Sequence, residues 1–146
     1  PTRYGGVHGP DLGEVARLTG MPEGEVVRRH AAPVYPVLFL GFTPGFPYLG
    51  GLDPALATPR LETPRTRLPA GSVAIGGVQT GIYPLESPGG WRVVGRTPLR
   101  LFDPRRERPF LLAPGDGLRF VQVDAETFSA IAAAVEAGRH EAEVER

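Results

Sequence analysis

The first thirty residues place apolar side chains with the period of a helix. Apolar residues recur at i, i+3 and i+4 from residue 12 onward, and Gly20 follows them as a residue typical of helix ends. Pro22 then suits the first position of a second helix, on which Val27 and His30 share one face. The pattern over residues 9–30 therefore predicts two short helices.

Between residues 34 and 123 the chain consists of short apolar runs separated by glycine and proline turns. Residues 34–41 are almost continuously apolar, which predicts a strand buried on both faces. Pro36 within this run should lie at an edge or at a bulge, because proline cannot donate to a strand ladder. We expect further strands at about residues 73–75, 82–85 and 91–95, and half-buried strands where apolar residues alternate with arginine, at 99–101 and 118–120.

A third helix is predicted near the C-terminus. Asp124 is a good N-cap, Phe128, Ile131 and Val135 form an apolar stripe, and Gly138 ends the pattern. Helices at both ends of a run of short strands indicate a mainly β fold. We expect a closed β-barrel with flanking short helices and a C-terminal helix.

The residue types that the chain lacks exclude several classes of chemistry. Its 146 residues include no Cys, no Lys and no Asn, so every basic residue apart from histidine is an arginine. Without Cys there is no disulfide, thiol nucleophile or Cys-based zinc site, and without Lys there is no P-loop and no lysine to carry pyridoxal phosphate or biotin. Missing Cys and Asn together with many prolines fit a thermophile, and missing Lys and Asn, which have AT-rich codons, also fit a GC-rich genome.

Charge is balanced overall but uneven along the chain. Residues 60–119 hold ten arginines against five acids, a surplus of +5 that would attract an anionic partner. The two N-terminal helices resemble a helix-turn-helix, but the second would begin with Glu23 and Glu25, which DNA phosphates repel. We therefore expect these helices to brace the barrel and no nucleic acid to bind.

Membrane attachment is not predicted either. No apolar stretch reaches the roughly 20 residues that a membrane helix needs, and the N-terminus has no signal-peptide pattern. We expect a cytoplasmic protein.

Histidine is the first candidate for proton transfer. His30 ends the second predicted helix, where it could shuttle a proton or bind an anion, or could instead be a buried histidine bonded to a nearby carbonyl. No two of His8, His30 and His140 have the spacing of metal ligands, so we expect no metal site.

Polar residues are densest between residues 64 and 98, where glycines separate them. Glycine allows close approach of the backbone, and arginine can clamp a carboxylate or phosphate with two bonds. Ser87 precedes a glycine turn whose N–H groups could hold a carboxylate, although such a turn also forms without any ligand. This composition suits either a pocket for a small polar ligand or a set of surface arginines over hairpin loops. The residues are Arg65, Arg67, Gln79, Thr80, Tyr83, Ser87, Trp91, Arg92, Arg96 and Thr97.

Several motifs, in order along the chain, resemble those of one known family. They are Gly41-Phe42-Thr43-Pro44-Gly45-Phe46-Pro47-Tyr48-Leu49-Gly50-Gly51-Leu52, Pro64-Arg65, Pro69-Ala70-Gly71-Ser72-Val73-Ala74-Ile75, Gln79-Thr80-Gly81-Ile82-Tyr83-Pro84, Ser87-Pro88-Gly89-Gly90-Trp91, Gly95-Arg96-Thr97-Pro98 and Pro114-Gly115-Asp116. Over residues 3–123 the chain resembles the family of 5-oxoprolinase B subunits, also called allophanate hydrolase subunit 1 or Kip-type histidine kinase inhibitors.

The resemblance implies the C-terminal, cyclophilin-like β-barrel of a longer subunit. Residues 1–8 would then be a linker from a missing N-terminal domain, residues 9–138 the carboxyltransferase-type domain, and residues 139–146 an acidic tail. It does not imply prolyl isomerase activity, because a shared fold does not carry function.

The resemblance also implies a part of an enzyme. The chain would be a non-ATP-binding subunit of an ATP-dependent 5-oxoprolinase, which converts 5-oxoproline to glutamate together with a homologous partner, the C subunit, and with a third protein, the A subunit. It would hold no cofactor itself, since the complex uses the ATP, and its small-molecule substrate would be an amide. Two alternatives are a regulatory domain that binds and inhibits a sensor histidine kinase, and amide chemistry of the allophanate hydrolase or urea carboxylase type.

Roles for single residues follow from the same resemblance. His30 would move a proton, Gln79, Thr80 and Ser87 would orient an amide or carboxylate, and Arg65 and Arg96 would hold an anionic group. Tyr83, Gly89 and Gly90 would complete the substrate site. Phe42, Phe46, Tyr48 and Trp91 would form a docking patch for a partner, or would pack in the core.

Overall fold

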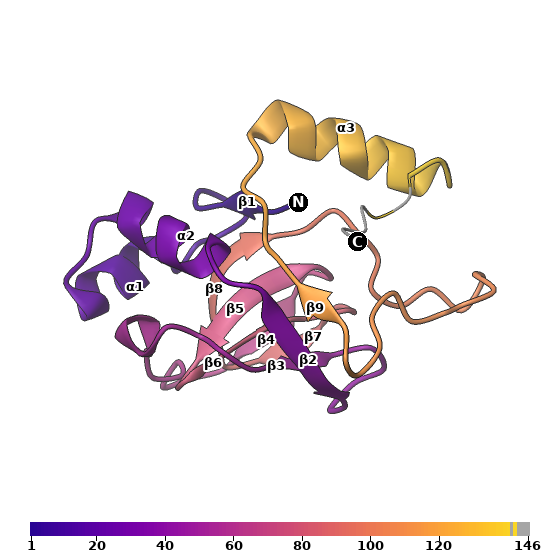
Figure 1. The fold of residues 1–146 in the computed structure, drawn as a ribbon. Coiled ribbons are helices and arrows are strands. Elements are labelled where there is room, and N and C mark those ends of the chain that lie inside the picture. Colours follow the sequence, from indigo (N-terminus) through magenta and orange to yellow (C-terminus); the bar gives the residue numbers. More distant parts are fainter. Residues whose placement is uncertain (141, 143–146) are drawn as a thin grey trace.

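The fold, described by a computed structural model for residues 1–140 and 142, is built on a seven-stranded antiparallel sheet (Figure 1). Its strands lie in the order β1-β8-β5-β6-β3-β2-β9, and a separate pair, β4-β7, forms a second small sheet. The strands are β1 (Arg3–Tyr4), β2 (Tyr35–Leu40), β3 (Pro47–Leu49), β4 (Arg65–Leu68), β5 (Ser72–Gly76), β6 (Gln79–Ile82), β7 (Ser87–Gly89), β8 (Arg92–Arg96) and β9 (Gly117–Leu118).

The helices agree with the sequence pattern. Gly20 ends α1 in the left-handed conformation, at φ 72°, and the Asp124 carboxylate accepts the Thr127 N–H to cap α3. Figure 1 shows α1 and α2 together beside the sheet and α3 apart from them. None of the helices within the described residues is long and apolar enough to cross a bilayer. They are α1 (Leu12–Thr19), α2 (Glu23–Ala31), the short 3₁₀ helix η1 (Pro54–Leu56) and α3 (Ala125–Glu136).

The sheet curls but does not close. Its edge strands β1 and β9 share no ladder, and a single parallel bridge between Thr2 and Gln122 links the segments next to them. The mainly β fold with three helices is therefore confirmed, and the expectation of a closed barrel is wrong. The physical reason is that each edge strand has two residues, too few for the ladder that closure requires.

The two faces of the sheet bury separate hydrophobic cores because side chains alternate along each strand. On β5, Val73 and Ile75 join the inner core, which α1 and α2 cover. Ala74 between them points to the opposite side, the outer face, where the pair β4-β7 contributes cover. The outer aromatic core on that side consists of Phe46, Leu68, Ala74, Tyr83, Trp91 and Val93.

Strand β2 departs from its prediction. Tyr35 and Val37 are buried, but Leu38 and Phe39 are 54% and 52% exposed, so the expectation of burial on both faces is wrong. Pro36 lies between β3 and β9 rather than at an edge, and the register shifts just after it, between Val37 and Phe39. Among the residues that the structure describes, none covers the outer face over β2, and the apolar sequence does not predict this.

Other strands were displaced or missed. The strand expected at 82–85 lies earlier, as β6, and residues 99–101 form no strand. β3, β4 and β7 were not predicted because they are three or four residues long and carry proline, glycine or arginine at positions that read as turns.

Residues 1–8, expected to be a linker, contribute β1 to the sheet beside β8. His8 then packs its ring against Phe128 of α3, with ring centroids 4.4 Å apart. An N-terminal domain before this segment stays a prediction. Of the expected acidic tail at 139–146, residues 141 and 143–146 lie outside the described residues.

Candidate functional site

His30 lies in a chain of hydrogen bonds inside the inner core. The Thr80 hydroxyl donates to the Ala74 carbonyl over 2.9 Å, so its oxygen accepts from His30 Nε2–H at 2.8 Å. Nδ1 is then the acceptor for the Tyr4 hydroxyl at 2.7 Å. This places the proton of the neutral ring on Nε2 and satisfies both ring nitrogens.

Burial keeps the His30 ring neutral. The residue is 0% exposed, and its ring lies 4.5 Å from Phe120 and 5.9 Å from Tyr35, between ring centroids. Burial lowers the pKa of His30 to about 3, because the charged form would lose its hydration. The same burial raises the pKa of Tyr4 above its usual range. The histidine thus joins β1, α2 and β6 and presents no face to solvent.

Arg65, expected to hold an anionic ligand, is bound to Asp11. Its two terminal nitrogens donate to the Asp11 carboxylate over 2.5 and 2.7 Å, and this ion pair raises the pKa of Arg65. The same carboxylate accepts the Val93 N–H at 2.7 Å. The guanidinium therefore clamps β4 to the residue before α1 and to β8.

The two arginines expected to act together are apart. Arg65 is held near Val93, whereas Arg96 is the last residue of β8, about 10 Å further along the strand. Arg96 donates from Nε to the Ala70 carbonyl at 3.0 Å.

The remaining residues of the polar cluster divide between the two faces. Thr80 points into the inner core with His30, while Tyr83 belongs to the outer aromatic core. On the outer side, Gly89 pairs with Arg65, and a Cβ at Gly89 would lie 2.5 Å from the Tyr83 hydroxyl. Gly90, Gln79 and Ser87 are half-buried, and the Ser87 hydroxyl is buried within β7 without a hydrogen-bond partner.

The four aromatic residues expected to dock a partner also divide. Phe46 and Trp91 are 2% and 8% exposed, so they are core residues and offer no surface. Tyr48 is half-buried against them, and Phe42 is 66% exposed. The structure thus revises the expected patch to its two outer members.

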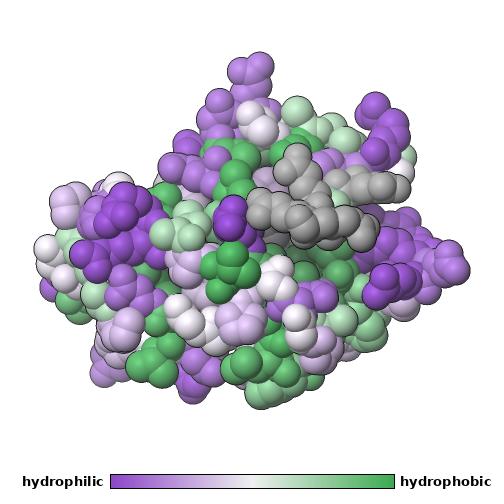
Figure 2. Space-filling model, viewed as in Figure 1, coloured by the Kyte–Doolittle hydropathy of each residue, from purple (hydrophilic) through white to green (hydrophobic). Residues whose placement is uncertain are grey.

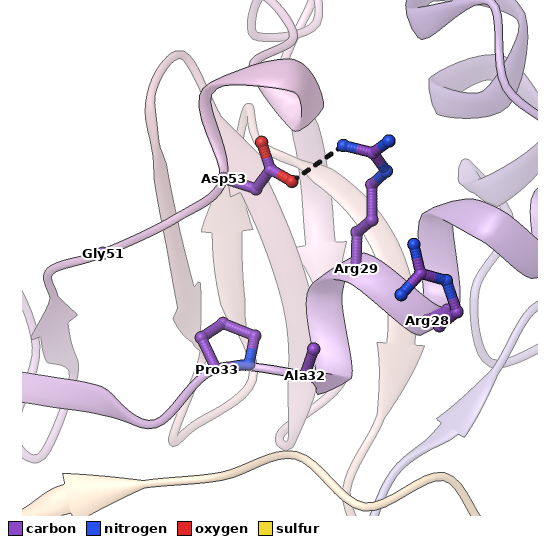
Figure 3. A pocket seen from close by; sticks show the side chains of 6 residues that line it. All are labelled: Arg28, Arg29, Ala32, Pro33, Gly51 and Asp53. Atoms are coloured by element: carbon purple, nitrogen blue, oxygen red, sulfur yellow. Dashed lines mark hydrogen bonds and ion pairs between the residues drawn. The ribbon is translucent and has the colours of Figure 1, made fainter.

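A hollow of about 450 Å³ opens at the end of α2 (Figure 3). Arg28 and Arg29 line one side, and Asp53 lies opposite, where its carboxylate accepts from Arg29 at 3.1 Å. Glu25 binds both arginines, and these bonds lower the pKa of Glu25 to about 2. The remaining lining residues are Ala32, Pro33 and Gly51.

This hollow offers a small molecule both a hydrogen-bond donor and a hydrogen-bond acceptor. The N–H of Ala55 and then Arg29 lower the pKa of Asp53, so its carboxylate is charged and can accept an N–H. Arg28, whose side chain is 65% exposed, can donate to a carboxylate. A volume of this size lies in the range of small-molecule sites.

Sequence reasoning missed Asp11, Tyr4 and the residues of the hollow. Asp11 stands before an apolar helix and reads as an ordinary cap, and nothing local shows that its partner is 54 residues away. Arg28 and Arg29 read as a solvated helix end. Within the part of the chain that the structure describes, no group of three or more His, Asp or Glu side chains could hold a metal ion.

Comparison with known proteins supports the resemblance found in the motifs. Residues 1–112 match the family described as carboxyltransferase domain, subdomain C and D. The chain is 58% identical over 121 residues to the B subunit of 5-oxoprolinase from Escherichia coli O157:H7, covering 83% of this chain and 56% of that protein. It is 48% identical over 130 residues to the B subunit of 5-oxoprolinase from Bacillus subtilis, covering 89% and 54%. The chain thus spans about half the length of these relatives.

Solved structures share the fold. A conserved uncharacterised protein of Pyrococcus horikoshii has a TM-score of 0.85 and 53% identity, over 88% of this chain and 59% of that one. The urea carboxylase of Kluyveromyces lactis has a TM-score of 0.76 and 28% identity, over 92% of this chain and 13% of that one.

Proposed function

The chain belongs to the family of carboxyltransferase domains, subdomain C and D, and we propose that it serves as part of the B subunit of a 5-oxoprolinase. The observation that carries the proposal is 58% identity over 121 residues to the Escherichia coli protein. The 121 matched residues include the motifs at residues 41–52 and 79–91, which carry the resemblance. The family assignment made from those motifs is confirmed.

In this function the chain acts with the A and C subunits in the cytoplasm and is inactive alone. The complex hydrolyses ATP and opens the lactam of 5-oxoproline to give glutamate, and this chain contributes surface and binding groups rather than an ATP site. That division fits a chain without lysine, since the usual P-loop grip on phosphates needs one.

The hollow at the end of α2 is the place where we expect the substrate to contact this chain. 5-Oxoproline carries one carboxylate and one lactam N–H, which match the Arg28 guanidinium and the Asp53 carboxylate. Its small size suits a volume of about 450 Å³.

His30, sealed in the inner core, acts as a positioning residue that holds β1 and β6 to α2. Gln79 and Ser87 do not line the hollow, so this proposal gives them no contact with the amide. Arg65 fixes β4 to the residue before α1 and to β8. The Ser87 hydroxyl is buried and has no hydrogen-bond partner among the described residues.

The test is glutamate formation by the full-length protein, mixed with the A and C subunits of the same genome. We expect ATP-dependent product from the wild type, and a KM for 5-oxoproline at least tenfold higher for Arg28→Ala. Arg17→Ala is the matched control, because Arg17 forms the same kind of exposed i,i+3 pair, with Glu14 on α1. No glutamate from the wild-type complex would contradict the function, and an unchanged KM for Arg28→Ala would contradict the site.

Urea carboxylase or allophanate chemistry is the second candidate. The similarity to urea carboxylase and to the urea amidolyase of Lachancea kluyveri, 38% identical over 80 residues, favours it. Offering urea and allophanate to the same complex separates the two, since we expect turnover of 5-oxoproline alone.

The regulatory alternative predicts micromolar binding to the dimerisation domain of a sensor histidine kinase, which a pull-down measures.

A further inference from the structure

The outer aromatic core continues to the protein surface over β3 and β2. Trp91 contacts Phe46, with ring centroids 5.6 Å apart, and Phe46 contacts Tyr48 at 5.2 Å. Tyr48 then stacks on Phe39 at 4.4 Å. Trp91 and Phe46 are 8% and 2% exposed, Tyr48 is half-buried and Phe39 is 52% exposed. The pair β4-β7 contributes cover at the start of the row, and nothing in the described residues covers its end.

Neighbouring residues extend the exposed end into an apolar surface. Leu38 lies over Gly50, where a Cβ would meet its methyl groups at 3.5 and 3.6 Å. Phe42, at φ 68°, is the one described non-glycine residue with a positive φ, and it is 66% exposed. Figure 2 shows hydrophobic residues exposed on the side of the molecule where β2 lies in Figure 1. We call Leu38, Phe39, Phe42 and Tyr48 the β2 patch.

The backbone beside the β2 patch is an open sheet edge. β9 pairs with β2 at Tyr35 and Pro36, and Val37 bonds to residues 115 and 116. Within the described residues, Leu38–Leu40 therefore has a strand neighbour only on the β3 side. Such an edge offers N–H and C=O groups to an incoming extended segment.

The base of a hairpin with a net positive charge lies next to the turn that follows β2. The turn after β2 touches the base of this hairpin, since a Cβ at Gly45 would lie 3.4 Å from Phe110. Residues 103–109 carry three arginines against two acids, a net charge of +1, and Arg105 and Arg108 are exposed. Arg105 is paired with Asp103, and an occupant that extends from the apolar rings past the turn at Gly45 meets this hairpin.

We propose that the β2 patch binds an extended segment of a partner polypeptide, with apolar side chains toward Phe39 and Phe42 and acidic side chains toward the 103–109 hairpin. The segment pairs with the free edge of β2 and covers the exposed end of the outer aromatic core. The proposal rests on the proposed function in naming the partner, which is the homologous C subunit of the complex. A second copy of this chain fits less well, because a symmetric contact would bring two hairpins of like charge into one interface.

The experiment measures the affinity of the full-length protein for the purified C subunit. The test variant is Leu38→Glu with Phe39→Glu, and the matched control is Val78→Glu, an apolar residue 73% exposed in the turn between β5 and β6. We expect at least a tenfold larger Kd for the double variant and no change for the control, with thermal unfolding checked for each protein. Arg105→Glu with Arg108→Glu should also weaken binding, by an amount that shrinks as salt is added.

The outcomes distinguish a failure of this docking proposal from a failure of the proposed function. Equal binding by the wild type and the double variant, or an equal loss in Val78→Glu, overturns it, as does self-association of the wild type that the double variant abolishes. If the wild-type complex forms no glutamate but still binds the C subunit through the patch, the proposed function fails and this inference stands.

Discussion

The two faces of the central sheet differ in how completely their apolar side chains are covered. The inner face is closed where α1 and α2 cover it, and even the polar His30 is 0% exposed with both ring nitrogens bonded. The outer face is closed at Trp91 and open at Phe39, along one continuous row of aromatic rings. The comparison indicates that the covered parts of both faces make the domain stable, whereas the open end of the outer face serves another molecule.

The largest expected effect is on the free energy of unfolding, and it differs between the two ends of the aromatic row. Trp91→Ala removes a buried indole that packs on Phe46 and Tyr83, and we expect it to lower the free energy of unfolding by about 3–5 kcal/mol. Phe39→Ala should cost less than about 1 kcal/mol, since half of that ring is already in water. Denaturant unfolding of both variants measures the difference, and equal losses would show that the row is uniformly structural.

The closed face should respond to acid through His30. Its pKa is about 3 in the fold and near 6.5 when unfolded, so the unfolded chain binds the proton first as pH falls. The contribution of neutral His30 to the free energy of unfolding is therefore intact above pH 6.5. Below pH 6.5 it falls by about 1.4 kcal/mol per pH unit, until the pH nears 3. The pKa values of Glu25 and Asp103 are lowered to about 2, so their protonation reduces the free energy of unfolding only below about pH 4.5.

The window between pH 6.5 and 4.5 thus isolates the histidines. His30→Gln should flatten the pH dependence of the unfolding free energy there, even if the variant is less stable at pH 7. His8→Gln is the control, because burial also lowers the pKa of the half-buried His8, and its effect should be smaller than that of the fully buried His30. A slope unchanged by His30→Gln contradicts the neutral, sealed histidine.

Two arginines on β4 give a matched comparison within the outer face. Asp11→Ala leaves Arg65 and the Val93 N–H without their shared partner, and we expect a loss of about 2 kcal/mol. Glu86→Ala removes the partner of Arg67, in a pair with side chains 77% and 55% exposed, and should cost less than about 0.5 kcal/mol. Thermal unfolding at neutral pH checks both, and similar losses would mean that the clamp does not fix β4 to β8.

The smallest effect concerns the strained residue of the β2 patch. Phe42→Gly relieves a positive φ and loses little burial, so we expect the domain to be unchanged or about 0.5 kcal/mol more stable. Binding to the C subunit should nevertheless weaken, because a ring of the patch is gone. A destabilised Phe42→Gly would mean that this ring supports the fold rather than a partner.

Local patterns predicted the elements that local interactions determine. The three helices were predicted because their caps and apolar stripes lie within a few residues of one another, as Gly20 and Asp124 show. The family was predicted because its motifs are long and ordered. Closure of the sheet was predicted wrongly, since it depends on how two short edge strands from opposite ends of the chain meet.

The candidate site was less predictable for the same reason. The sequence singled out His30 to move a proton and Arg65 to hold an anion, but their partners Thr80 and Asp11 lie 50 and 54 residues away and occupy them. Phe46 and Phe42 read alike in one motif, yet the structure buries the first and exposes the second. Only the packing of distant strands decides which polar group is free and which aromatic ring is covered.

Hydrogen exchange of the full-length protein, free and bound to the C subunit, compares the two faces in one measurement. We expect the amides of residues 38–42 to exchange more slowly in the complex, because the partner covers the open end of the outer face. Amides of α1 and α2 on the closed face should not change. Protection of α1 and α2 with none at residues 38–42 would contradict the account.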